Sequence, residues 1–306
     1  ARLRRAITRG FLSAHDFCCI ATGSVREAPP DELAALLLDI AKIDNGIGVA
    51  LDILHMRLYF DTKDQYSRSQ KLIEAGRHLL RYFDFTTMTT SQDCAIHDVI
   101  LVCCAGKEGE TISREICAQV RTRFEAVYRS TNDIGYVLKA LFKMHPLIAL
   151  DEFLLPELNS GNIGHFNNID DYSAPVETVN AEILLQWANI DPDRRFPLLG
   201  KAIAMFNRLP VDDENYAKVH ALFIEVLRHA PNKRVFLGDN LRSRLRPRSW
   251  SGSLADILMR RRAAICTLAD NSDAEVRQWV AETLPQLDRW IENERRTDRN
   301  TEQSFE

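Results

Sequence analysis

Apolar residues recur at spacings of three and four along most of this chain, and polar residues fill the positions between them. The clearest run lies near the end, where Val276, Val280, Leu284, Leu287 and Ile291 follow one another at these intervals. Such spacing places an apolar stripe along one face of a helix. The alternation of apolar and polar residues that marks a half-buried strand is almost absent. The pattern therefore predicts an all-α protein.

The helix boundaries follow from the ends of the apolar runs and from capping residues. In the first part of the chain we expect helices around residues 33–40, 47–58, 72–83, 96–103, 111–127, 134–141 and 147–158. Further helices are expected from 175 through 187 and over about 193–208, 213–229, 234–245, 253–269 and 273–294. Asn45-Gly46 is typical of a left-handed helix end, and Ser272 with Glu275 predicts a capping box.

Pairing these helices gives units that begin near residues 31, 68, 111, 147 and 193. The spacing is close to the roughly 40–47 residues of two-helix HEAT or armadillo units. We therefore predict an α-α superhelix of HEAT/armadillo-like helical hairpins. An irregular helical bundle gives much the same pattern and stays open. Residues 1–158 and 175–306 are expected to form two helical-repeat regions, continuous with each other across a long loop at 159–174.

The segment 268–287 resembles a HEAT repeat. A first helix ends in Leu268-Ala-Asp270, a short turn follows, and Asp273-Ala-Glu-Val-Arg277 begins the second helix. In that family an acid in the turn and the arginine after the valine commonly tie neighbouring repeats together, which implies this role for Arg277. Asp270 lies one residue further from Arg277 than is usual, so either Asp270 is displaced or Asn271 takes its position.

The last sixty residues also resemble the C-terminal helical regions of large bacterial multidomain proteins. The resemblance rests on the segment 250–256, the run Arg260-Arg-Arg262 and the closing segment 288–296. Some of those proteins carry an NTPase or effector domain upstream, but this chain has no Walker, dinucleotide-binding or zinc-protease motif. The basic start Ala1-Arg-Leu-Arg-Arg5 resembles a transit peptide, although we favour a fragment of a longer protein.

Positive charge is concentrated in the window 233–262. Nine basic residues and two acids give it a net charge of +7, which leaves −11 for the rest of a chain whose total is −4. The functional interpretation is a patch for phosphate or for an acidic protein surface. The alternative is a solvated edge that pairs with acids elsewhere in the array. The partner-binding candidates in this window are Arg242, Arg244, Arg246, Arg248, Trp250, Arg260, Arg261 and Arg262.

The loop at 159–174 is the second candidate, because long irregular loops in compact domains tend to be functional or disordered. Ile163, Phe166, Ile169 and Tyr172 recur every three residues there. Packing against the protein's own helices is the simpler interpretation. The more specific interpretation is a contact with a partner through Phe166 and Tyr172.

The remaining chemistry gives no candidate metal, cofactor or catalytic residue. No two of the eight histidines lie three or four residues apart, the spacing that brings two ligands onto one helix face. His15-Asp16 and His97-Asp98 are adjacent, and neighbours on a helix point in different directions, so neither pair is expected to be hydrogen bonded. The seven cysteines form no C-x-x-C motif and are expected to be reduced and small buried hydrophobes.

Together these features predict a cytoplasmic, non-catalytic binding, scaffolding or sensing module whose partner is a protein or another domain of the same polypeptide. No apolar run approaches the ~20 residues that span a bilayer, so no membrane contact is expected. The first alternative is a nucleic-acid-binding repeat module that uses residues 233–262. The second is an all-helical enzyme without a recognisable motif.

Overall fold

The computed structural model of the chain is built from helices, which confirms the predicted class. It describes residues 5–6, 9–11, 27–63, 69–126, 134–156, 174–207, 217–238, 245–247 and 252–303. Over these ranges no strand forms, and Phe206 and Val219 make an isolated antiparallel bridge. The chain divides into two compact units, Ala1–Pro156 and Glu157–Glu306.

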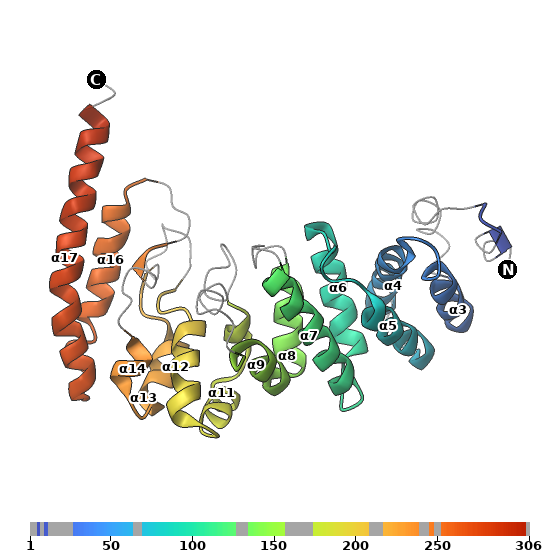
Figure 1. Ribbon diagram of the computed structural model, residues 1–306, viewed down its shortest axis with the longest axis horizontal. Coiled ribbons are helices and arrows are strands. Elements are labelled where there is room, and N and C mark those ends of the chain that lie inside the picture. Colours follow the sequence, from blue (N-terminus) through green and yellow to red (C-terminus); the bar gives the residue numbers. More distant parts are fainter. Residues whose placement is uncertain are drawn as a thin grey trace. The chain divides into compact units, whose positions relative to one another are not determined.

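The helices of the first unit lie close to their predicted positions (Figure 1). They are α3 (Pro30–Ile40), α4 (Gly46–Lys63), α5 (Gln70–Tyr82), α6 (Thr90–Cys103), α7 (Gly109–Ala126), α8 (Gly135–Met144) and α9 (Pro146–Leu154). Pro30 and Pro146 each occupy the first turn of a helix, where the missing N–H costs nothing. The left-handed residue before α4 is Asn45 (φ 59°), and α3 ends earlier, at Ile40.

Each helix of the first unit packs against the helix two places further along the chain. One row consists of α3, α5, α7 and α9, and the other of α4, α6 and α8. We call these the odd row and the even row. Apolar side chains from both rows are fully buried, among them Leu54, Leu79, Val99, Ile116 and Leu138. The stripes that predict the helices are therefore the surfaces by which the two rows pack.

Polar contacts also join successive helices within the odd row. Lys71 of α5 donates to Asp31 of α3 at 2.5 Å. Arg81 of α5 donates to Glu115 of α7 at 2.7 Å, and Arg121 of α7 donates to Glu152 of α9 at 2.9 Å. The partners of these three bonds lie 40, 34 and 31 residues apart in sequence, so each bond links one helical hairpin to the next.

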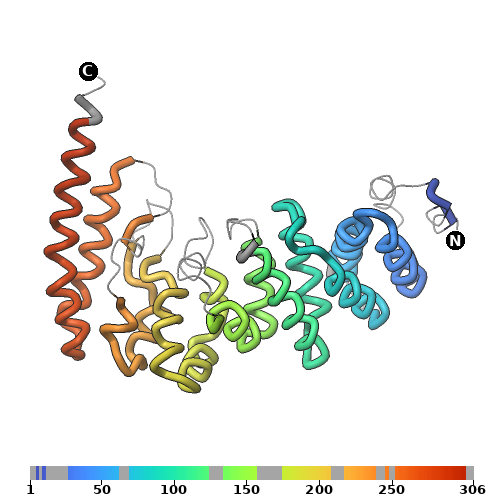
Figure 2. Tube along the Cα trace, viewed as in Figure 1, coloured from blue at the N-terminus to red at the C-terminus, as the bar shows by residue number. Residues whose placement is uncertain are grey.

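The second unit contains η2 (Pro175–Thr178), α11 (Ala181–Ala188), α12 (Pro192–Ala202), α13 (Ala221–His229), α14 (Lys233–Leu237), α16 (Leu254–Cys266) and α17 (Ala274–Gln303). Here too α11 packs on α13 and α12 on α14. The two C-terminal helices, α16 and α17, lie side by side along the length of α16, and α17 also packs on α14 (Figure 2).

Four predicted helices of this unit differ from expectation: one is divided and three are shorter. The helix from 175 is divided, because Asn180 is extended and its side chain accepts from Glu182 N to begin α11. The helix predicted to reach 208 ends at Ala202, and the one predicted from 213 begins at Ala221; Phe206 and Val219 form their bridge between the two. The helix predicted over 234–245 ends at Leu237, because Gly238 adopts a left-handed conformation (φ 65°).

Candidate functional site

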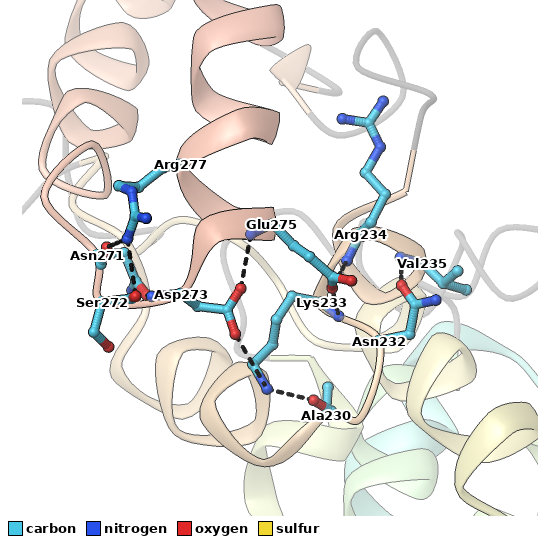
Figure 3. Close-up of polar contacts among 10 residues, drawn as sticks. All are labelled: Ala230, Asn232, Lys233, Arg234, Val235, Asn271, Ser272, Asp273, Glu275 and Arg277. Atoms are coloured by element: carbon cyan, nitrogen blue, oxygen red, sulfur yellow. Dashed lines mark hydrogen bonds and ion pairs between the residues drawn. The ribbon is translucent and has the colours of Figure 1, made fainter.

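The basic window 233–262 meets acidic residues of α17. Lys233 and Arg234 are the first two residues of α14, and Glu275 lies in the first turn of α17 (Figure 3). Glu275 Oε2 accepts from the backbone N of Lys233 at 2.8 Å and from that of Arg234 at 3.3 Å. The Arg234 guanidinium lies 2.6 Å from Glu282 Oε2 of α17. Lys233 Nζ lies 3.9 Å from Asp273 Oδ2, so each of the two cations of α14 has a carboxylate nearby within the unit.

The arginines of α16 also contact groups of their own unit. Arg262 forms a bidentate pair with Asp288 of α17, in which Nε bonds Oδ1 and Nη2 bonds Oδ2 at 3.1 Å. This pairing raises the pKa of Arg262 and lowers the pKa of Asp288. Arg261 donates from Nη1 to the Leu245 carbonyl at 2.8 Å, and its guanidinium lies 5.1 Å from the centre of the Phe206 ring.

Arg246 and Arg260 are exposed, although each also takes part in an interaction with another residue. The other candidates of the window, Arg242, Arg244, Arg248 and Trp250, lie outside the described residues, as do Phe166 and Tyr172 of the 159–174 loop. Their roles stay predictions. Within the described part of the window, the basic side chains on α14 and two of those on α16 are half-buried and contact groups of the same unit, whereas Arg246 and Arg260 are exposed.

The capping box predicted for α17 does not form. Asp273 begins the helix, because its Oδ1 accepts from Glu275 N at 2.9 Å. Ser272 is exposed, and its carbonyl accepts from Arg277. The Glu275 side chain, which a capping box would turn back onto its own helix, instead binds the start of α14 (Figure 3). The sequence contains the Ser272 and Glu275 of a capping box, but the side chain of Asp273, which is adjacent to the helix, caps α17 instead.

Arg277 contacts the turn that precedes its own helix. Its Nη1 donates to the carbonyl oxygens of Asn271 at 2.7 Å and Ser272 at 2.8 Å. Asn271, rather than Asp270, thus occupies the position opposite the arginine, and it contributes a backbone carbonyl instead of a side chain. The resemblance to a HEAT repeat implies a bond from Arg277 to a neighbouring helix. In this structure it is Glu275 that bonds to a neighbouring helix, α14.

A second polar cluster lies on the even row of the first unit. Asp98 of α6 accepts from His55 Nε2 of α4 at 2.9 Å and from His97 Nδ1 at 2.8 Å. The prediction that His97 and Asp98 would not be bonded is therefore wrong. Adjacent side chains on a helix leave the backbone in different directions. The side chains of His97 and Asp98 are nevertheless long enough to meet, and the bond from His55 holds the Asp98 carboxylate in place. A sequence signal exists in hindsight: His55 and Asp98 are 43 residues apart, about one repeat.

The His97–Asp98 pair has the geometry by which a carboxylate orients a general base, because Asp98 holds Nδ1 and leaves Nε2 available. The nearest thiol in sequence on this face is Cys94, one turn earlier on α6. Although Cys94 is exposed, partial desolvation raises the pKa of its thiol, and the Asp98 and Asp93 carboxylates raise it further. A raised pKa keeps Cys94 protonated and weakly nucleophilic, so the cluster contains no activated cysteine.

Three of the described cysteines behave as small core residues, as predicted. Cys103, Cys104 and Cys117 are buried, whereas Cys94 is exposed and Cys266 half-buried, so the prediction of burial is wrong for Cys94. Burial raises the pKa of Cys104 to about 11 and also raises that of Cys117. Cys18 and Cys19 lie outside the described residues.

No group of three or more His, Cys, Asp and Glu side chains suited to a metal ion was found among the residues that the structure describes. Across the same residues, none of the helices combines the length and the apolar character needed to cross a bilayer. Comparison with known proteins identifies no relative: neither a protein-family model, nor a curated protein, nor a solved structure matches this chain.

Proposed function

We propose that this chain is a non-catalytic helical-repeat module that binds or scaffolds a protein partner in the bacterial cytoplasm. The observation that carries the proposal is the packing of the first unit, where each helix contacts the helix two places along. This is the neighbour-to-neighbour contact of solenoid proteins, whose extended surfaces hold other molecules.

The spacing of the polar ties supports the repeat interpretation. Contacts between successive hairpins join residues 31 to 43 positions apart, including His55 to Asp98 and Asp31 to Lys71. These intervals of 31 to 43 residues are each about the length of one helical hairpin, which favours stacked hairpins over an irregular bundle. The resemblance of residues 268–287 to a HEAT repeat favours that family, although Arg277 bonds its own turn instead of a neighbouring repeat.

We further propose that the partner surface lies around Arg246 and Arg260, together with Arg242, Arg244 and Arg248. Both described arginines are exposed, and the planar guanidinium fork suits a carboxylate. Within the unit the neighbouring cations already bind carboxylates of an acidic helix, as Arg234 does with Glu282 and Arg262 with Asp288. An acidic protein surface is therefore the favoured partner, and nucleic acid is the alternative.

A crosslinking experiment tests this proposal. A photoreactive amino acid in place of Arg246 should capture a discrete protein in cells, and the same probe in place of Lys201, exposed on α12, should not. With the purified partner, changing Arg242, Arg244, Arg246 and Arg248 to Ser should weaken binding at least about tenfold, whereas Arg289→Ser on α17 should not. Equal capture at both positions, or undiminished affinity of the quadruple variant, would reject the proposed surface.

Salt dependence separates the protein partner from nucleic acid. A module that neutralises several phosphates loses affinity steeply with salt, by a factor of about 10³–10⁵ between 50 and 200 mM for six to ten contacts. Fluorescence anisotropy with single- and double-stranded DNA and with RNA at both salt concentrations measures this. Tight, salt-sensitive binding that disappears in the quadruple variant would establish the alternative.

The enzyme alternative rests on the His97–Asp98 pair. If that pair acts as a general base, His97→Gln should abolish a turnover that Lys139→Gln, one helix away on the same row, leaves intact. A panel of ester and amide substrates tested with the wild type provides the measurement. We expect no turnover above buffer, because Cys94 is not activated.

A further inference from the structure

Helix α14 is too short to be stable in isolation. It spans only Lys233–Leu237, and isolated helices shorter than about 12–15 residues are marginal in water because nucleation is costly. Its stability must therefore come from the helices around it. The contacts at its two ends and on its buried side show which helices supply it.

The first three backbone N–H groups of α14 have no acceptor within the helix, and two of them depend on α17. Glu275 of α17 accepts from Lys233 N and Arg234 N. The Asn232 side chain accepts from the third, Val235 N, at 2.9 Å, and the Asn232 carbonyl accepts from Phe236 N at 3.1 Å in the first bond within the helix. Without Glu275 two of these three free donors would lose their partner.

The other end of α14 is also bound by α17. Gly238 N donates to Arg234 O at 2.9 Å, which closes the helix, and Gly238 O accepts from the indole Nε1 of Trp279 at 3.1 Å. Trp279 is buried and lies four residues after Glu275, one turn further along α17. One face of α17 therefore holds the beginning and the end of α14.

The opposite side of α14 packs on α12 and α13. Phe236 and Leu237 are fully buried, and the Phe236 ring lies 5.0 Å from that of Phe223 on α13. The backbone of Phe236 passes so close to Gly200 of α12 that a Cβ at Gly200 would overlap the Phe236 carbonyl. Helix α14 thus connects α12 and α13 to the α16–α17 hairpin.

From these contacts we infer that the folding of α14 depends on α17. Helix α14 is folded only while α17 is docked, and it unfolds as a unit when α17 dissociates from it. Unfolding would expose the apolar Phe236 and Leu237 together with the cations of Lys233 and Arg234. The inference concerns a conformational device within the second unit and does not depend on the proposed partner. Elements that open locally below the global unfolding free energy are the ones that regulated proteins use.

Hydrogen exchange of the full chain tests the inference in a Glu275→Ala variant. The informative amides are those of Val235, Phe236 and Gly238, because none of them bonds to Glu275. Their exchange should accelerate at least about tenfold, since two helix-end donors lose their acceptor. The amides inside α12 and α16 should keep their wild-type exchange rates.

Three further variants make the outcome decisive. Glu275→Gln keeps an acceptor oxygen and should stay within about threefold of the wild type, whereas Trp279→Phe should accelerate the same amides because it removes the indole donor. Glu292→Ala, exposed on α17 and remote from α14, is the matched control and should change nothing. Wild-type protection of residues 235–238 in Glu275→Ala, or an equal loss of protection in α12, α14 and α16, would overturn the inference.

Discussion

At the scale of single residues, Gly76 lies where α5 packs closely on α4 and α6. A Cβ atom at this position of α5 would overlap Cys103 Sγ of α6 and lie 2.8 Å from Leu54 Cδ2 of α4. Gly76→Ala should therefore lower the free energy of unfolding by about 1–3 kcal/mol despite its better helix propensity. Urea denaturation measures the change.

Two further variants serve as controls for the Gly76 prediction. Cys103→Ala should cost some packing alone but should relieve part of the Gly76→Ala defect in the double variant, because the overlapping sulfur is gone. Glu74→Ala, on the exposed side of the same helix, should stay within about 0.5 kcal/mol of the wild type. Additive effects of Gly76→Ala and Cys103→Ala would show that the two positions are not in contact.

The buried thiols give a second prediction at this scale. Because burial raises the pKa of Cys104 to about 11 and raises that of Cys117 as well, both stay protonated at pH 8 and should resist labelling by a thiol reagent in the native protein. Mass spectrometry after labelling, with and without denaturant, identifies the modified positions. Rapid native labelling of Cys117 would contradict the burial described above.

At the scale of elements, α17 is the helix whose charges matter most. The pKa of Glu282 is lowered by the Gln278 amide and by the Arg234 guanidinium, and the pKa of Asp288 by Arg262. A carboxyl group whose folded pKa lies below its unfolded pKa stabilises the fold above the unfolded value, which is near 4. That stabilisation is lost as the pH falls through the folded pKa.

Acid should therefore weaken the docking of α17. We expect the Tm of the wild type to fall more steeply between about pH 5 and pH 3 than that of a Glu282→Gln, Asp288→Asn double variant. The difference should be small, since both pairs are exposed to solvent. Glu292→Gln serves as the control carboxyl, and calorimetry over this pH range is the measurement. Parallel curves for all three proteins would be evidence against the stabilising role of these pairs.

The elements also show how far the sequence could be interpreted. Apolar spacing locates most of the helices because one stripe per helix is a local property, visible without knowing its partner. The contacts that position α14 are not local: Glu275 and Lys233 are 42 residues apart, and the Ser272–Glu275 pattern predicted a different use for the same carboxylate. The bond between His55 and Asp98 could not be predicted for the same reason, because these residues are 43 positions apart and lie on different helices.

At the scale of the whole molecule, the division at Pro156 predicts two units that fold separately. Each unit buries its own apolar core, as Leu138 does in the first and Phe223 in the second. Fragments 1–156 and 157–306 should each show a helical circular dichroism spectrum and a cooperative thermal transition when produced alone. A fragment without helical signal would show that its core needs the other half of the chain.

The packing of each helix on its second neighbour has a kinetic consequence for the first unit. Because substantial helix contacts there reach no further than two places along the chain, no contact has to close a loop as long as the unit, and the entropy cost of loop closure stays limited. Low contact order goes with rapid folding, on the microsecond to millisecond scale for helical domains. Any adjacent pair of hairpins can start the process, so a mutation that stops nucleation at one end should redirect the folding route without slowing it greatly.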